Sequence, residues 1–247
     1  MKLLFLAIET SPNVCYTWGL HHQDISPNQI ITPSSILCWS AQWYGEKQQI
    51  FFSRRTGFNA MIKAAHKVLE AADAVCHYNG NGFDIPRLNQ EFLRLSLTPP
   101  APAQQIDLLR VAQSRFGLPS NKLEFVAPYF GIGAKVKHPG MELWTGCINN
   151  DAASWKLMET YNKQDVALLV KLYEKLLPWI PNHPNMNHFV DGKERCCTNC
   201  GSKHIESRGM RFATTFTYRR LRCSSCGTWM RERASLKQVP AASLRPL

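Results

Sequence analysis

The sequence predicts an α/β protein in which a mixed sheet is flanked by helices, followed by a small cysteine-rich module. Aromatic and aliphatic runs come first and then alternate with amphipathic segments, until a stretch rich in proline and asparagine ends the pattern. Two pairs of cysteines follow that stretch. We therefore expect a first domain over residues 1–177, a linker over 178–188, the module over 189–234 and a tail over 235–247.

Strands are expected first, because the runs LLFLAI, VCYTWGL and SILCWSAQWY are rich in aliphatic and aromatic residues. Residues 59–73 then place apolar side chains at helical spacing, and residues 74–79 read as a short buried strand. In the segment SNKLEF, Asn121 precedes Glu124 by three positions, which predicts that Asn121 caps a helix. Three further helices are expected over residues 84–96, 106–116 and 151–176.

The chain carries a strong positive charge: 29 Lys+Arg against 18 Asp+Glu gives +11, which favours a polyanionic partner such as nucleic acid. The apolar run before Glu9 is shorter than the roughly 7–15 residues of a signal-peptide core. No run approaches the ~18 apolar residues of a membrane span. We therefore expect an intracellular, cytoplasmic protein that is not secreted and contacts no membrane. In such a reducing compartment the nine cysteines indicate metal ligation rather than disulfides.

Two C-x2-C-G motifs, separated by 22 residues, supply four thiols: Cys197, Cys200, Cys223 and Cys226. Paired turns of this kind hold Zn²⁺ in a tetrahedral, four-thiolate structural site. Cys196 and His204 lie nearby and could also bind a metal, but we expect neither of them to be a ligand. The intervening segment alternates β-forming residues with arginine, as a hairpin does, and the module resembles a zinc ribbon whose metal supplies much of its stability.

The module is also rich in arginine and aromatic residues, a combination suited to phosphate and base contacts. We expect Arg211, Arg219 and Arg220 to bind nucleic acid. A solvated charged face around a structural metal, or a docking site for a protein partner, are the alternatives.

Three acids occupy positions that can meet at one edge of a sheet. Glu9 follows the first strand, Asp84 begins a helix after a glycine-rich turn, and Asp165 lies in the last helix, four residues after Tyr161. Converging carboxylates favour hard divalent cations, Mg²⁺ or Mn²⁺. Two residues before Glu9, on the same face of the strand, Ala7 stands where a second acid would complete a metal-binding edge.

These segments resemble the Exo I, Exo II and Exo III motifs of the DEDD (DnaQ-like) 3′→5′ exonucleases, which have an RNase H-like fold. The family patterns are D-x-E, N-x3-F-D and, in the DEDDy subclass, Y-x3-D. The matching segments here are Ala7-Ile8-Glu9, Asn79 through Phe83-Asp84, and Tyr161 through Asp165. The resemblance covers about residues 2–177 and leaves the zinc ribbon outside the usual family pattern.

The resemblance implies that two metal ions cleave DNA from a 3′ end and release nucleoside monophosphates. Glu9 and Asp165 would bind the ion that activates water, and Asp84 would complete the second site. Tyr161 would orient the activated water, since a phenol with an unperturbed pKa of about 10 is a poor base at neutral pH.

In the Exo II segment, Asn79 and Phe83 are expected to contact the nucleic acid, DNA rather than RNA. Ala7 departs from the family pattern, in which the aspartate at this position contacts both ions, so we expect impaired catalysis. Either the chain is a disabled variant with Asp→Ala, or it is a natural pseudoenzyme that binds strand ends without cutting. An exoribonuclease and a nucleic-acid-binding adaptor are the other open interpretations, because nothing in the sequence shows whether a 2′-OH is read.

Overall fold

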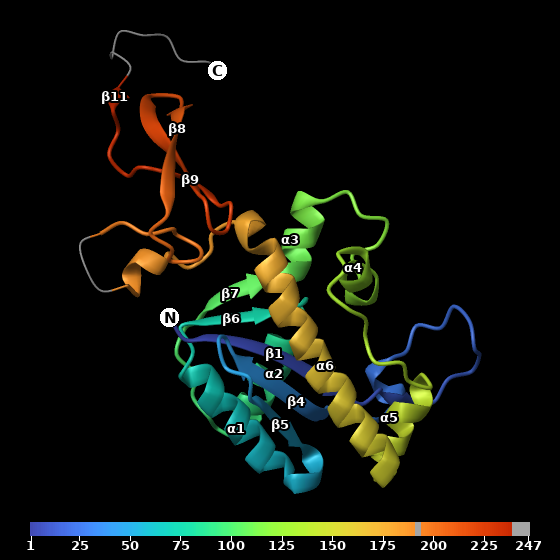
Figure 1. Ribbon diagram of the computed structural model, residues 1–247. Helices are drawn as coiled ribbons and strands as arrows, with labels where there is room; N and C mark the ends of the chain where they lie inside the picture. Colours follow the sequence, from blue (N-terminus) through green and yellow to red (C-terminus); the bar gives the residue numbers. More distant parts are fainter. Residues whose placement is uncertain (191–193, 239–247) are drawn as a thin grey trace. The chain divides into compact units, whose positions relative to one another are not determined.

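The computed structural model describes residues 1–190 and 194–238, and it divides into two compact units, Lys2–Tyr173 and Glu174–Leu247 (Figure 1). The tail residues expected beyond position 238 lie outside the described residues. Among the described helices, none combines the length and the apolar character that a membrane span requires.

The first unit is built on a five-stranded mixed sheet in the order β5-β4-β1-β6-β7. The central strand β1 pairs antiparallel with β4 and parallel with β6, and β6 in turn pairs parallel with β7. This confirms the mixed sheet expected from the sequence. The strands are β1 (Leu3–Thr10), β4 (Ile36–Trp43), β5 (Gln49–Ser53), β6 (Ala74–His77) and β7 (Gln104–Asp107); a separate two-stranded pair joins β2 (Val14–Cys15) to β3 (Ile30–Thr32).

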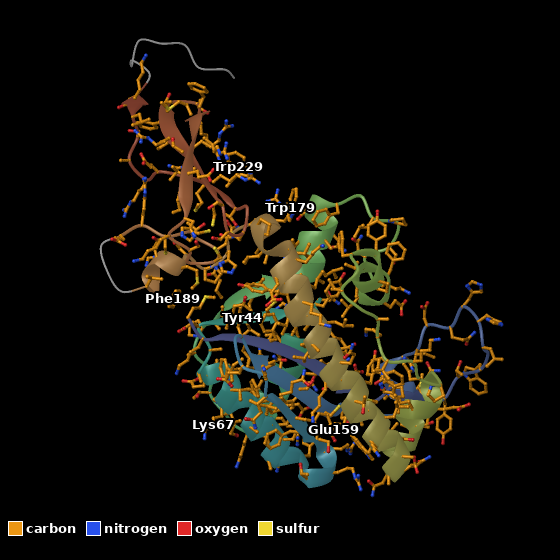
Figure 2. The ribbon with its side chains drawn as sticks, in the orientation of Figure 1. Tyr44, Lys67, Glu159, Trp179, Phe189 and Trp229 are labelled. Carbon is orange, nitrogen blue, oxygen red and sulfur yellow. The ribbon has the colours of Figure 1, made fainter. Side chains whose placement is uncertain are left out.

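Helices cover both faces of this sheet (Figure 1). On one face, Ile8 of β1 belongs to a buried cluster with Met61 and Leu88 from the first two helices. On the other face the rings of Phe5 and of Tyr44, which Figure 2 labels, pack against Tyr173 of the last helix. Both ring centroids lie 5.4 Å from that of Tyr173. The helices are α1 (Phe58–Glu70), α2 (Asp84–Arg94), α3 (Leu108–Arg115), α4 (Leu123–Tyr129), α5 (Met141–Ile148) and α6 (Ala152–Leu176).

Two local expectations are wrong. The run VCYTWGL gives a strand only at Val14–Cys15, and the side chains that follow it, such as Trp18, are exposed, so they have no sheet face to pack on. Asn121 does not cap α4: that helix begins at Leu123 with Lys122 at its N-cap, and no side chain makes a capping hydrogen bond.

The second unit contains an antiparallel sheet in which β9 (Phe216–Cys223) is paired by β8 (Ile205–Phe212), β10 (Trp229–Arg231) and β11 (Lys237–Gln238). The β8–β9 pair is the expected hairpin. The segment expected as a linker includes a short 3₁₀ helix, Met186–His188, just after another at Leu177–Trp179. The segment is tied to the cysteine region, because the Asn187 side chain donates to the Cys196 carbonyl and accepts from the Cys196 amide, both at 2.9 Å.

Candidate active site

Side-chain alternation along β1 sends Ala7 and Glu9 to the face covered by α6. Ile8, between them, points into the core under α1 and α2, whereas Phe5 contacts Tyr173 of α6. The strand therefore exposes one short row of side chains toward the last helix, and Glu9 is its acidic member.

A cavity of about 500 Å³ opens at this edge of the sheet. It is lined by side chains from β1, from the segment that precedes α2, from α6 and from the loop before α5. Among its lining residues are six that the sequence singled out: Ala7, Glu9, Asn79, Phe83, Asp84 and Asp165. Tyr161 reaches the same group through a hydrogen bond, since its hydroxyl accepts from Lys135, which also lines the cavity.

Asp84 is positioned by a tight turn between β6 and α2. Its Oδ1 accepts a hydrogen bond from the Ile8 amide at 2.9 Å, which ties the start of α2 to β1. The turn needs Gly80, because a Cβ at that position would lie 2.3 Å from Cγ of the buried His77. Burial raises the pKa of the Asp84 carboxyl to about 7.

His77 and Asp107 stabilise this turn through hydrogen bonds with its backbone amides. The Gly80 amide donates to Nδ1 of His77 at 3.0 Å, so Nε2 carries the proton and donates to Gln105. Burial lowers the pKa of His77, which agrees with a neutral ring. Asp107 Oδ1 accepts from the Asn79 amide at 2.9 Å and fixes the entry to the turn, where Asn79 adopts a positive φ of 65°.

Glu9 lies in a strongly acidic environment. Burial raises the pKa of its carboxyl to about 8, and the nearby Asp165 and Asp84 raise it further, while a hydrogen bond with the Trp144 side chain opposes the shift. Lys135 also opposes the shift, without cancelling the effect of burial and of the two acids.

Lys122 and Lys135 both line this cavity, and of the two it is Lys135 that contacts an acid of the group. Its Nζ donates to Asp165 Oδ2 at 2.7 Å and to the Tyr161 hydroxyl at 2.8 Å. Although burial disfavours the charged amine, Asp165 outweighs it and holds the pKa of Lys135 above its usual value. Burial likewise raises the pKa of Asp165, and its Oδ1 is buried without a hydrogen-bond partner among the described residues.

The rotation of α6 about its own axis, relative to the sheet, is fixed by Asn162, which is fully buried. The Ser40 hydroxyl donates to its backbone carbonyl at 2.8 Å, and its side-chain amide donates to the Ala7 carbonyl at 3.3 Å. These bonds lock the helix against β1 and β4, so Tyr161 and Asp165 face Glu9. Sequence reasoning missed both Asn162 and Lys135, because neither belongs to a recognisable spacing and both act through contacts made only in the folded chain.

The acidic group has the donor chemistry for a hard divalent cation. Glu9, Asp84 and Asp165 offer carboxylate oxygens, and the unpartnered Oδ1 of Asp165 and the raised pKa values both call for positive charge. The three carboxylates are nevertheless not drawn together tightly. Within residues 1–190 and 194–238, only the four cysteines form a group of three or more metal-ligand side chains whose ligand atoms all lie within 4.8 Å of one another.

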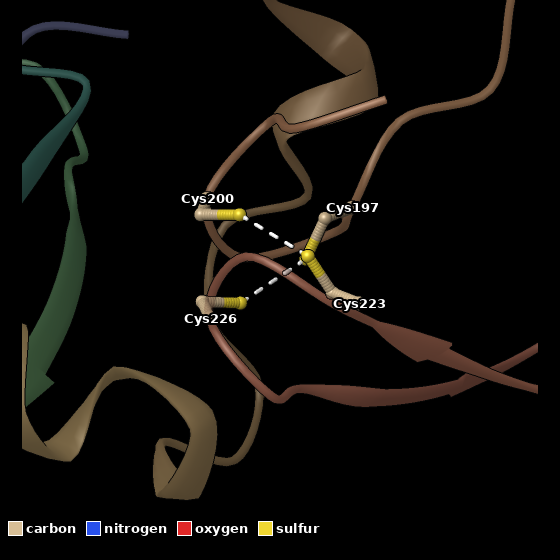
Figure 3. A group of neighbouring side chains, drawn as sticks. All are labelled: Cys197, Cys200, Cys223 and Cys226. Carbon is tan, nitrogen blue, oxygen red and sulfur yellow. Dashed lines mark hydrogen bonds between the residues drawn. The ribbon is translucent and has the colours of Figure 1, made fainter. Parts of the chain in front are cut away.

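Those cysteines come from two equivalent turns in the second unit, and their thiols point toward a common centre (Figure 3). The Sγ atoms of Cys197 and Cys226 lie 3.6 Å apart, as do those of Cys200 and Cys223. A tetrahedral centre with metal–sulfur bonds of about 2.3 Å requires a separation of roughly 3.8 Å. The group is thus a possible zinc-binding site, and neighbouring Cys196 is not part of it.

The arginines expected to bind nucleic acid lie on the β8–β9 hairpin of the second unit. Arg211 pairs across the strands with Tyr218, while Arg219 and Arg220 are consecutive on β9 and therefore project to opposite faces of the sheet. Arg211 and Arg220 therefore project to one face of this sheet and Arg219 to the other.

A mixed sheet covered by helices, with an acidic cavity where a central strand meets the last helix, defines a nuclease-like domain. The family model of the RNase H superfamily matches residues 4–177, and the chain belongs to that superfamily. None of the curated proteins matches.

Among solved structures, the chain is similar to a family B DNA polymerase from the hyperthermophilic archaeon Pyrobaculum calidifontis, with a TM-score of 0.51 and 21% sequence identity. The match covers 72% of this chain and 24% of the polymerase chain, so it spans about a quarter of that protein's length. At this identity the likeness establishes the fold, which is RNase H-like as expected.

Proposed function

We propose that this chain is a divalent-metal-dependent 3′→5′ exonuclease of the DEDDy subclass that acts on DNA and is impaired by Ala7. One observation carries the proposal: Glu9, Asp84 and Asp165 line a single cavity, and Ala7 lines it at the position of the first acid of the D-x-E pattern. The similarity to a DNA polymerase supports DNA as the substrate. Nine thiols without a disulfide among the described residues support an intracellular, cytoplasmic place of action.

Bound divalent ions, Mg²⁺ or Mn²⁺, would supply an activated water and stabilise the leaving oxygen. Glu9 and Asp165 would hold one ion and Asp84 the other. Because burial, and then Asp165, raise the pKa of Tyr161 to about 12, its hydroxyl keeps its proton at neutral pH and serves as a hydrogen-bond donor rather than a base. Lys135 would release Asp165 when an ion is held there. The four cysteines would hold a structural Zn²⁺.

Ala7→Asp tests the proposal. The added carboxylate would complete the ion-binding edge, and we expect release of mononucleotides from 3′ ends, dependent on Mg²⁺ or Mn²⁺. The gain should be at least about 10²–10³-fold, the effect of one well-placed electrostatic group on a reaction rate. Ala7→Asn is the matched control, since it adds nearly the same volume without the charge and should restore little.

Substrates labelled at the 5′ end, as single-stranded DNA, double-stranded DNA and single-stranded RNA, report both polarity and preference. Faster degradation of RNA than of DNA would identify the activity as that of an exoribonuclease rather than a DNA exonuclease. The absence of cleavage with any substrate and either ion would refute the nuclease and favour a protein that binds without cutting. That second candidate is supported by Lys135, whose ammonium group already neutralises Asp165.

A further inference from the structure

One face of the second unit's sheet gathers arginines around an exposed tryptophan. Across the β9–β10 ladder Trp229 is paired with Arg222, and Arg231 with Arg220. Paired residues of an antiparallel ladder project to the same face, as do alternate residues along a strand. Tyr218, two residues before Arg220, therefore shares this face. We call these five residues the arginine–tryptophan face.

The side chains of this face are ordered by contacts with one another. The guanidinium carbons of Arg220 and Arg222 lie 5.2 Å and 5.7 Å from the centre of the Trp229 ring, and that of Arg231 lies 4.0 Å from the Tyr218 ring. These cation–π contacts hold the guanidinium groups of Arg220 and Arg222 beside the indole and leave most of their N–H donors available, while Nη1 of Arg231 donates to the Glu232 carbonyl at 3.2 Å. Trp229 remains 54% exposed, and its side chain projects from the sheet (Figure 2).

Within the described part of the chain, no acid pairs with the guanidinium groups of this face. Glu206, the cross-strand partner of Arg222, also projects to this face, but its carboxylate pairs with Arg208 at 2.6 Å. Arg220, Arg222 and Arg231 form no ion pair there, and the Nε of Arg220 is fixed instead by the Arg208 carbonyl at 2.8 Å. The opposite face differs, because Arg219 shares Glu232 with another arginine. Unpaired cations therefore concentrate on the side that also presents the indole.

This combination selects its ligand. Guanidinium groups with free donors bind phosphate, and an exposed ring between them offers a stacking platform for a base. In a duplex the base faces are already stacked on one another, so a single strand can use the ring and a duplex cannot. An acidic peptide would satisfy the charges but would leave the indole of Trp229 without a planar partner.

We propose that the arginine–tryptophan face binds single-stranded nucleic acid, with a base stacked on Trp229 and phosphates bound by Arg220 and Arg222. The proposal rests on the proposed function for the class of ligand, and it deepens that function by adding a strand-binding site separate from the acidic cavity. The pair Arg222 and Trp229 and the pair Arg220 and Arg231 lie about 7 Å apart along the strands, so the face can span more than one nucleotide.

The test measures binding of the full chain, with zinc-to-protein ratios determined, to fluorescein-labelled 12-nucleotide DNA and RNA and to the corresponding DNA duplex. Fluorescence anisotropy is recorded without added Mg²⁺ or Mn²⁺, over a range of salt concentrations. Trp229→Ala should weaken single-strand binding roughly 5- to 150-fold, the effect of removing one base–aromatic stack. Replacing both Arg220 and Arg222 by alanine should lower the salt slope by about 1.4, since each phosphate contact contributes about 0.7.

The opposite face supplies matched controls. Phe212→Ala removes an exposed aromatic side chain, and Arg219→Ala removes the arginine next to Arg220; both should change the affinity less than two-fold. Equal losses from Trp229→Ala and Phe212→Ala would overturn the proposal, as would duplex binding that is tighter than single-strand binding and equally sensitive to Trp229. The double arginine variant decides the matter if the tryptophan variant does not fold.

The outcome is independent of the nuclease assay. If Ala7→Asp shows no cleavage while Trp229→Ala loses single-strand affinity, the strand-binding face stands and the exonuclease proposal fails. If cleavage appears and Trp229→Ala binds as tightly as the parent chain, the strand-binding proposal fails and the exonuclease proposal stands.

Discussion

Replacing Lys135 by methionine removes the cation that pairs with Asp165 while keeping a long unbranched side chain. The side chains of Lys135 and Asp165 are 24% and 9% exposed, so the pair is mostly buried. Breaking a buried pair by removing one partner costs about 3–5 kcal/mol, because the other charge stays desolvated. The residual exposure of Lys135 favours the lower end, about 3 kcal/mol, and for a unit of this size that lowers the melting temperature by roughly 6–12 °C.

The loss should depend on pH. Burial raises the pKa of Asp165 even with Lys135 present, and removing the ammonium group raises it further. At acidic pH the carboxyl is protonated in both proteins and the pair contributes little. As the pH rises from the acidic to the neutral range, the parent ionises Asp165 beside Lys135, whereas the variant must keep the carboxyl protonated or bury an uncompensated charge, so the gap in melting temperature should widen with pH. Differential scanning calorimetry across that range measures it.

Divalent cations should reverse the loss. An ion held by Asp165 and Glu9 would compete with Lys135 in the parent chain but not in the variant, so Mg²⁺ at about a hundred times its dissociation constant would stabilise the variant by about 2.7 kcal/mol. Lys137→Met, at an exposed lysine two residues away, is the control and should change neither quantity. A variant that melts like its parent at every pH, or that gains no more from Mg²⁺, would show that Lys135 does not occupy an ion-binding position.

Three further predictions concern the turn, the last helix and the cysteines. Gly80→Ala should destabilise the fold by at least about 1–3 kcal/mol, because the new Cβ meets the His77 ring; Gly117→Ala, where a Cβ meets nothing within 4 Å, should leave the melting temperature nearly unchanged. In the chain restored with aspartate at position 7, Tyr161→Phe should slow cleavage less than loss of a carboxylate does, and single-turnover rates will show whether it does. Cys200→Ser should reduce zinc from about one ion per chain and increase protease cleavage in the second unit, whereas a Cys197–Cys223 disulfide in the purified protein would contradict the zinc assignment.

The large features of the fold could be read from the sequence, because they depend on local periodicity. The apolar run of β1, the helical spacing of α1 and the long α6 all lie close to the expected ranges. β5 and α5 were not anticipated, since β5 is short and only half-buried and α5 carries little polar contrast. β7 was also missed: Ile106 and Asp107, expected to begin a helix over 106–116, end this strand, and α3 begins at Leu108. The cap predicted for Asn121 failed because the chain turns one residue later, where Ser120 accepts from the Lys122 amide.

Some residues of the candidate site could be predicted from the sequence and others could not. Glu9, Asp84 and Asp165 were accessible from spacing, since each stands at a junction or helix position that a sheet edge can bring together. Lys135 could not be found from the sequence, because it lies in the loop before α5 with no recognisable spacing and meets Asp165 only when α6 packs on the sheet. On the second unit, the arginine content was evident, but the division into two faces depends on strand register, which composition does not reveal.

The raised pKa values around the cavity bear on the order in which its ligands arrive. With a pKa of about 8 for Glu9 and about 7 for Asp84, these two groups are largely or half protonated at neutral pH, and Lys135 offsets the charge of Asp165. A phosphodiester strand approaching the ion-free cavity therefore meets little net repulsion. An aspartate at position 7 would add negative charge and make a cation the necessary first arrival. Under the proposed function, the alanine at position 7 would allow the strand to bind before the ion, whereas an aspartate there would require the ion to bind first.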